Sequence, residues 1–149
     1  MVKISREVTI QAPLSRVFDF LAEPENLPEI WANLIEVKNV RHPKIGNNIQ
    51  YDWTYKMSGL RFEGRSEIVD YSLYERLTTK SVKGPSSILA WQFGKEERET
   101  RVNFEIEYEI PAALLQKVNQ TIIVQENEHD VDAMLQNLRS HVELQMVQA

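Results

Sequence analysis

The chain has 149 residues, no cysteine and a formal net charge of −5 at pH 7. The acidic balance without a basic cluster excludes nucleic acid and anionic membrane surfaces as expected partners, and the lack of cysteine excludes disulfides, thiolate metal sites and a cysteine nucleophile. With 42% hydrophobic and 26% charged residues, the composition is that of a globular protein, and the length predicts one domain, 1–149, with a full hydrophobic core.

No targeting or membrane-spanning segment is expected. The first residues, MVKISREV, lack the apolar stretch of a signal peptide, and no run approaches the roughly 18 apolar residues of a membrane span. The cytoplasm is therefore the default location, and the absence of cysteine agrees with a reducing compartment.

The first part of the chain predicts a strand followed by two short helices. Apolar residues alternate with polar ones over 2–10, as in a strand that is buried on one face. Pro13 then opens a stretch with apolar residues at helical spacing. A second short helix is predicted to start at Pro28 and to carry Trp31 and Leu34.

From residue 35 to residue 110 the hydrophobic period is mostly two, which predicts an antiparallel meander with one dry face. The predicted strands are 35–40, 49–57, 60–71, 74–82, 88–94 and 100–110. The stretch HPKIGNN at 42–48 is predicted to be the turn between the first two of them. A sheet with one dry face needs a cover, and the C-terminal helix is the obvious one.

The helical region after Pro111 presents apolar residues on two different faces. The first stripe consists of Leu114, Leu115, Val118 and Ile122, and the second of Val131, Leu135, Leu138 and Val142. The segment TIIV is a poor helix former, and the polar QENEHD that follows has no apolar anchor. We therefore expect a short helix at about 112–120, an irregular or weakly helical stretch, and a second helix starting near Asn127 or Asp130. Three residues of the earlier stripe, Leu115, Val118 and Ile122, would line the cavity mouth as a movable gate, with a continuous helix as the alternative.

The order of elements resembles that of the START-like superfamily, also called SRPBCC or polyketide cyclase/dehydrase-like. The resemblance rests on VTIQAPLSRVFDFLAEPENLPEIW at 8–31, the glycine turn at Gly46, TRVNFEIEYEIP at 100–111 and LQNLRSHVE at 135–143. It implies an α+β helix-grip fold, in which a curved antiparallel sheet of about seven strands wraps around a long C-terminal helix, with two short helices between strands 1 and 2. It also implies a cavity that binds apolar or amphipathic molecules such as lipids, quinones or polyketides. Some members of this superfamily are cyclases, and others are carriers or sensors.

The inward faces of the predicted strands carry large aromatic residues beside small or hydroxylated ones. Gly64, Ser66, Thr79 and Ser81 occupy inward positions where a filled core would have Val, Ile or Leu. This pattern indicates unfilled space with a few hydrogen-bonding groups, although plain core packing and a bulge at Gly64 are alternatives. The expected cavity lining is Trp31, Trp53, Tyr55, Phe62, Ser66, Thr79, Trp91, Phe104, Tyr108, Leu115, Val118 and Ile122.

The sequence contains no recognisable catalytic or metal-binding motif. The histidines His42, His129 and His141 have no second ligand at metal-binding spacing, and no Gly-x-Ser-x-Gly or P-loop pattern occurs. We therefore expect no metal and no cofactor. The outward glutamates of 100–110 are interpreted as a solvated face.

Three interpretations of function remain open at this stage. The favoured one is a binding module whose partner is a small hydrophobic ligand. A cyclase or dehydratase could use Tyr55 or Tyr108 to donate to an oxyanion, but no general base is visible on an inward face. The third is a protein-interaction domain that uses the outer sheet face or the edge of the short helices. The sequence does not determine the oligomeric state.

Overall fold

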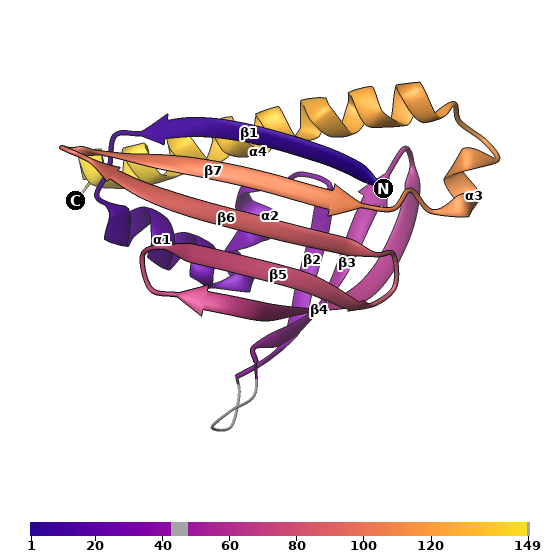
Figure 1. Cartoon of the computed structure of the whole chain (residues 1–149), viewed down its shortest axis with the longest axis horizontal. Helices are drawn as coiled ribbons and strands as arrows, with labels where there is room; N and C mark the ends of the chain where they lie inside the picture. The colour runs from indigo at the N-terminus through magenta and orange to yellow at the C-terminus, as the bar shows by residue number, and fades with distance from the viewer. Residues whose placement is uncertain (43–47, 149) are drawn as a thin grey trace.

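A computed structural model of the chain describes residues 1–42 and 48–148, so that the glycine turn predicted at Gly46 lies outside the described residues. Within these residues a strand is followed by short helices, a run of strands, a one-turn helix and a long helix (Figure 1). The elements are β1 (Val2–Ile10), α1 (Leu14–Ala22), η1 (Pro24–Asn26), α2 (Leu27–Ile30), β2 (Leu34–Arg41), β3 (Gln50–Met57), β4 (Leu60–Ser72), β5 (Arg76–Lys83), β6 (Ser87–Glu96), β7 (Glu99–Tyr108), α3 (Ala112–Leu115) and α4 (Gln120–Gln148).

The strands form one seven-stranded antiparallel sheet in the order β1-β7-β6-β5-β4-β3-β2. Consecutive strands from β2 to β7 are neighbours, and β1 closes the order beside β7. The sheet is strongly curved, because β2 and β3 run steeply across the direction of β6 and β7, and α4 lies along the β1 side (Figure 1). The α+β helix-grip fold predicted from the sequence is therefore confirmed.

The strand register places the predicted inward residues on one face. Directly opposite residues of an antiparallel pair point to the same side of the sheet. Tyr51 pairs with Ser66, Trp53 with Gly64, and Trp91 with Phe104. Alternation with a period of two therefore predicted correctly which side chains of these strands meet beneath the sheet.

One part of the core lies under α1, at the end of the sheet that also holds the C-terminus of α4 (Figure 1). Phe18 of α1 has no exposed surface and meets the rings of Tyr71, Tyr74 and Phe93 edge-on, with ring centroids 5.3–5.5 Å apart. Edge-to-face contacts of this kind add to the stabilisation that burial of the ring provides.

The predicted break in the C-terminal helix at 120–127 is wrong. The short helix α3 ends at Leu115, and α4 is one continuous helix from Gln120. Asn119 supplies the N-terminal cap, because its side-chain oxygen accepts a hydrogen bond from the backbone N–H of Thr121 at 2.8 Å. Cap formation and complete burial of Ile123 override the poor helix propensity of TIIV.

The second short helix also differs from its prediction. The helix α2 covers Leu27–Ile30 and ends before Trp31, whose backbone is extended. Leu34 already belongs to β2. None of the described helices is both long enough and apolar enough to cross a membrane.

Candidate functional site

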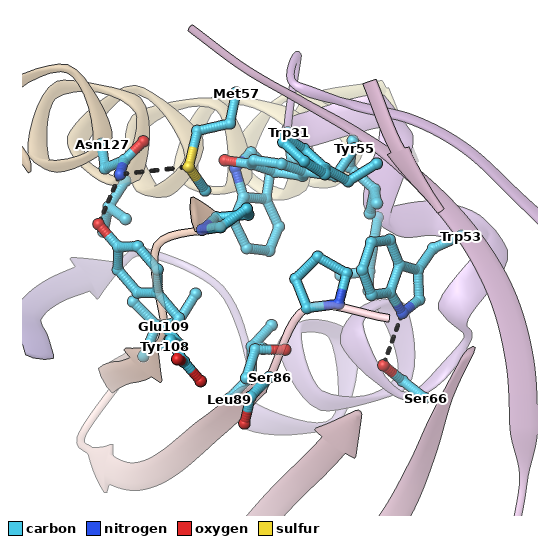
Figure 2. A pocket seen from close by; sticks show the side chains of 18 of the residues that line it. Trp31, Trp53, Tyr55, Met57, Ser66, Ser86, Leu89, Tyr108, Glu109 and Asn127 are labelled. Atoms are coloured by element: carbon cyan, nitrogen blue, oxygen red, sulfur yellow. Dashed lines mark hydrogen bonds between the residues drawn. The ribbon is translucent and has the colours of Figure 1, made fainter. Parts of the chain in front are cut away.

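The candidate site is a cavity of about 90 Å³ beneath the sheet, toward the end that carries α3. Side chains from β3, β4, β6, β7, α4 and the segment around Trp31 surround it (Figure 2). The walls are mostly apolar and aromatic, and they include Trp31, Tyr51, Trp53, Tyr55, Phe62, Leu89, Ile106, Tyr108 and Val131.

Half of the predicted lining residues meet at this cavity. Those that line it are Trp31, Trp53, Tyr55, Phe62, Ser66 and Tyr108. Thr79, Trp91 and Phe104 do not line it, because they are buried in the adjacent core, where the Trp91 and Phe104 rings pack 4.4 Å apart. That any of these side chains binds a ligand stays a prediction.

The predicted gate residues lie outside the cavity. Leu115 and Ile122 are 46% and 49% exposed, and Val118 packs against the edge of the core. The reason is the continuous helix, which turns Ile123 instead of Ile122 toward the sheet and buries it completely. A separate gate formed by this stripe is therefore not present in the described structure.

The glycine in the middle of β4 makes room for an indole ring. A Cβ atom at Gly64 would lie 2.3 Å from Cζ2 of Trp53 and 2.5 Å from the carbonyl oxygen of Lys83. The indole Nε1–H of Trp53 donates to Oγ of Ser66 at 2.8 Å (Figure 2). The space predicted at Gly64 is thus occupied by Trp53, and a register irregularity next to it, between Arg65 and Ser66, agrees with the bulge alternative.

A polar contact missed from the sequence closes the cavity on the α4 side. The side-chain amide nitrogen of Asn127, which is only 6% exposed, donates to the hydroxyl oxygen of Tyr108 and faces Sδ of Met57 at 3.9 Å (Figure 2). A thioether sulfur only accepts hydrogen bonds, so the amide nitrogen, and not the amide oxygen, suits this side. Asn127 lies four residues from both Ile123 and Val131, and a polar residue within a buried helical stripe was the signal that could have revealed it.

The indole N–H of Trp31 and the side chain of Asn33 lie beside the hydroxyl of Tyr55. The ring of Trp31 meets that of Tyr55 edge-on, with centroids 5.5 Å apart. The Trp31 Nε1–H is buried and lies near the Tyr55 hydroxyl without the geometry of a hydrogen bond, and it has no other partner among residues 1–42 and 48–148. Asn33, from the segment before β2, donates to the carboxylate of Asp130 on α4.

The tyrosines of the cavity remain protonated and can serve as hydrogen-bond donors. Burial raises the pKa of Tyr51 to about 12, against the weaker effect of hydrogen bonds with Thr79 and Ser66. Burial, followed by the negative charge of Asp130, also raises the pKa of Tyr55. For Tyr108, burial raises the pKa, and the hydrogen bond from Asn127 acts in the opposite direction.

The cavity interior carries no formal positive charge. Among the described lining residues there is no Lys, Arg or His, and the charged one is Glu109, whose side chain is exposed at the mouth. The backbone N–H of Glu109 donates to the carbonyl of Ser86 at 3.1 Å, which joins the end of β7 to the turn before β6. Within the described chain no group of three or more His, Cys, Asp or Glu side chains is arranged to hold a metal ion.

The curved sheet, the long helix and the apolar cavity define a START-like, helix-grip protein. Residues 1–143 match the family described as "Polyketide cyclase / dehydrase and lipid transport", and the chain belongs to this family. The predicted resemblance is therefore confirmed. No curated protein matches the chain.

Solved structures with the same fold have little sequence in common with the chain. TTHA0849 from Thermus thermophilus is 19% identical, with a TM-score of 0.80 over 95% of this chain and 97% of that one. The Zhui aromatase/cyclase from a Streptomyces species is 13% identical, with a TM-score of 0.73 over 95% and 93%. The major latex-like protein 151 from Panax ginseng is 18% identical, with a TM-score of 0.66 over 94% and 96%. At these identities the likeness establishes the fold alone.

Proposed function

We propose that the chain binds an apolar or amphipathic small molecule, such as a lipid, a quinone or a polyketide-like compound, in the cavity between sheet and α4. The observation that carries this proposal is an enclosure of aromatic and aliphatic side chains with a few polar groups among them. Ligand sites in proteins commonly have this composition. Membership of a family described by polyketide cyclisation and lipid transport supports the same class of ligand.

The size of the cavity adds a requirement for movement. Its volume of about 90 Å³ is well below the roughly 300–1,000 Å³ of typical ligand pockets. A ligand therefore needs the mouth to widen, and the segments that border it are Pro85–Ser87 and the end of β7 with Glu109 and Pro111. The hydrogen bond from Glu109 to Ser86 is the contact that widening would break.

A neutral fluorescent probe, N-phenyl-1-naphthylamine, tests this proposal by displacement with quinones and uncharged lipids. Leu89→Trp places a large ring on the cavity wall and is expected to weaken probe binding at least tenfold. Ile88→Trp is the matched control, because Ile88 is the neighbouring residue on the opposite face of β6. Equal probe affinity in wild type and Leu89→Trp, with both proteins folded, would exclude the cavity as the binding site.

A cyclase or dehydratase reaction is the second candidate, and one observation favours it. Asp130 is a half-buried carboxylate whose negative charge acts on the Tyr55 hydroxyl, and burial raises its pKa. A carboxylate beside a neutral phenol has the components of an acid–base pair. Turnover of a linear polyketide thioester that is lost in both Tyr55→Phe and Asp130→Asn, with probe affinity retained, would establish the enzyme. Unchanged turnover in both variants would exclude this role for the pair.

A further inference from the structure

The indole of Trp31 carries a hydrogen-bond donor that has no partner among the described residues. Trp31 lines the cavity, is only 5% exposed, and is held between the rings of Tyr55 and Phe104 at 5.5 Å and 6.2 Å. Its Nε1–H is buried and makes no hydrogen bond with any described residue. Buried donors in folded proteins are nearly always paired, so an unpaired one at a cavity wall indicates a partner that arrives from outside the chain.

The hydroxyl of Tyr108 is a second donor, and Asn127 determines how it is used. The amide nitrogen of Asn127 donates to the Tyr108 oxygen, which occupies an oxygen lone pair and leaves the O–H hydrogen free to donate. Met57 fixes this orientation of the amide, because its sulfur accepts on the same side. The hydroxyl is thus held as a donor at the cavity wall (Figure 2).

The electrostatic field at the cavity favours an uncharged ligand. The negative charges of Glu128 and Asp130 act on the Tyr108 hydroxyl, and Asp130 also acts on Tyr55. Arg6 pairs with Glu128 at 2.9 Å, so Asp130 supplies the main negative charge, and no cation stands among the described lining residues. A field that opposes phenolate formation equally opposes a carboxylate or phosphate at the same place.

From these observations we infer that the ligand carries an uncharged hydrogen-bond acceptor, the carbonyl oxygen of a ketone, quinone or ester, which binds to Trp31 Nε1–H and Tyr108 O–H. This inference rests on the proposed function and narrows its ligand class, because it excludes fatty acids and other anionic lipids. Because the Trp31 N–H is buried, the inference also requires that entry of the ligand uncovers it.

Three small molecules of nearly the same shape test the inference on the full-length chain. Acetophenone has a neutral carbonyl, α-methylstyrene replaces its oxygen by a methylene group, and benzoate carries a negative charge. Binding is followed by two-dimensional ¹H–¹⁵N NMR, in which each tryptophan indole gives its own signal. We expect acetophenone to bind about three- to tenfold more tightly than α-methylstyrene, as a net hydrogen bond provides, and benzoate to bind most weakly. The Trp31 indole proton is expected to shift downfield with acetophenone and not with α-methylstyrene.

Two variants remove the donors singly and keep the aromatic rings. Trp31→Phe and Tyr108→Phe are each expected to reduce the preference for acetophenone while α-methylstyrene still binds. Trp91→Phe is the matched control, because Trp91 is buried in the adjacent core and does not line the cavity, and it should keep the preference. The indole shift in wild type gives an independent readout if Trp31→Phe fails to fold.

The outcomes separate this inference from the proposed function. Equal affinity for acetophenone and α-methylstyrene, or tight binding of benzoate, would overturn the inference and leave a cavity that binds by shape alone. A preference for acetophenone that persists in both Trp31→Phe and Tyr108→Phe would overturn the assignment of the two donors. No binding of any of the three compounds or of N-phenyl-1-naphthylamine would overturn the proposed function as well.

Discussion

The two ends of the sheet are built from the same strands and differ in how completely they are filled. At the α1 end, Phe18 and Val102 have no exposed surface, and Phe18 packs edge-on against three aromatic rings. At the α3 end, the aromatic residues Trp31, Tyr55 and Tyr108 surround a cavity of about 90 Å³. The strand β7 contributes to both ends, Val102 at one and Tyr108 at the other.

The difference follows from the polar atoms that the cavity residues carry. A phenyl or isopropyl group packs against any apolar neighbour, whereas burial of an indole N–H or a phenol costs free energy unless a hydrogen-bond partner stands in the right direction. The Trp53 ring packs over Gly64, where its N–H donates to Ser66. The Tyr108 ring contacts α4, where its hydroxyl accepts a hydrogen bond from Asn127. Directional bonds of this kind hold large rings apart, and the space between them remains open.

The largest expected effect is at the filled end. Phe18→Ala removes a completely buried ring with three edge-on aromatic contacts and should lower the free energy of unfolding by about 3–5 kcal/mol, measured by urea denaturation. Phe62→Ala at the cavity wall, where the ring is only partly buried, should cost clearly less. Equal losses for the two variants would contradict the difference in packing between the ends.

The second prediction concerns alkaline pH and the cavity end alone. Burial raises the pKa of Tyr51 to about 12, so the folded protein retains a proton that the unfolded chain loses near pH 10. Stability therefore falls as the pH rises from 10 to 12, by about 2–3 kcal/mol from this group. Tyr51→Phe should make this part of the pH profile less steep, while Tyr55 and Tyr108, whose pKa burial also raises, keep part of the slope. Tyr71→Phe should change the slope less, because solvent screens the rise in pKa of this 52% exposed residue. The same dependence of stability on pH in wild type and Tyr51→Phe would contradict the raised pKa of Tyr51.

The third prediction tests the close approach of Trp53 to β4. Gly64→Ala should lower the free energy of unfolding by about 1–3 kcal/mol, because its Cβ collides with the indole and with the backbone carbonyl of Lys83. Displacement of the ring should also shift the tryptophan fluorescence. Gly94→Ala is the control, since a Cβ there meets only Arg101 at 3.9 Å. An unchanged free energy of unfolding in Gly64→Ala would show that the Trp53 ring moves aside at little cost and that the cavity wall is easily deformed.

The smallest expected effect belongs to the ion pairs that fasten α4 to β1. The Arg6 guanidinium contacts Glu128 and Asp132, each at 2.9 Å, and all three side chains are about a third or more exposed. Arg6→Met should therefore lower the free energy of unfolding by about 0–1 kcal/mol, and less at high salt. Lys3→Met, on the same strand but paired with Glu105 of β7, controls for loss of charge. A loss of several kcal/mol would mean that Arg6 holds the helix over the cavity far more firmly than exposed pairs do.

Local patterns were sufficient for the sheet and insufficient for the helix. Alternation in 49–57 and 60–68 predicted the faces that Tyr51, Trp53 and Ser66 occupy, because side-chain direction in a strand repeats every second residue. The position of the helix start was missed, because the Asn119 cap and the burial of Ile123 outweigh the propensity of TIIV. Propensity describes an isolated segment, and packing against the sheet overrides it.

The sequence by itself determined the fold class, the family, the inward faces of the strands and the group of aromatic residues from which the cavity is built. Tertiary structure alone decided which of these aromatics enclose space, since Trp91 and Phe104 fill the core while Trp31 and Tyr108 border the cavity. It also brought Asn127 of α4 into contact with Tyr108 of β7, 19 residues earlier in the chain. The physical reason is that periodicity fixes the face on which a side chain lies, whereas the partner that it meets there depends on sheet curvature and on the rotation of α4 about its axis.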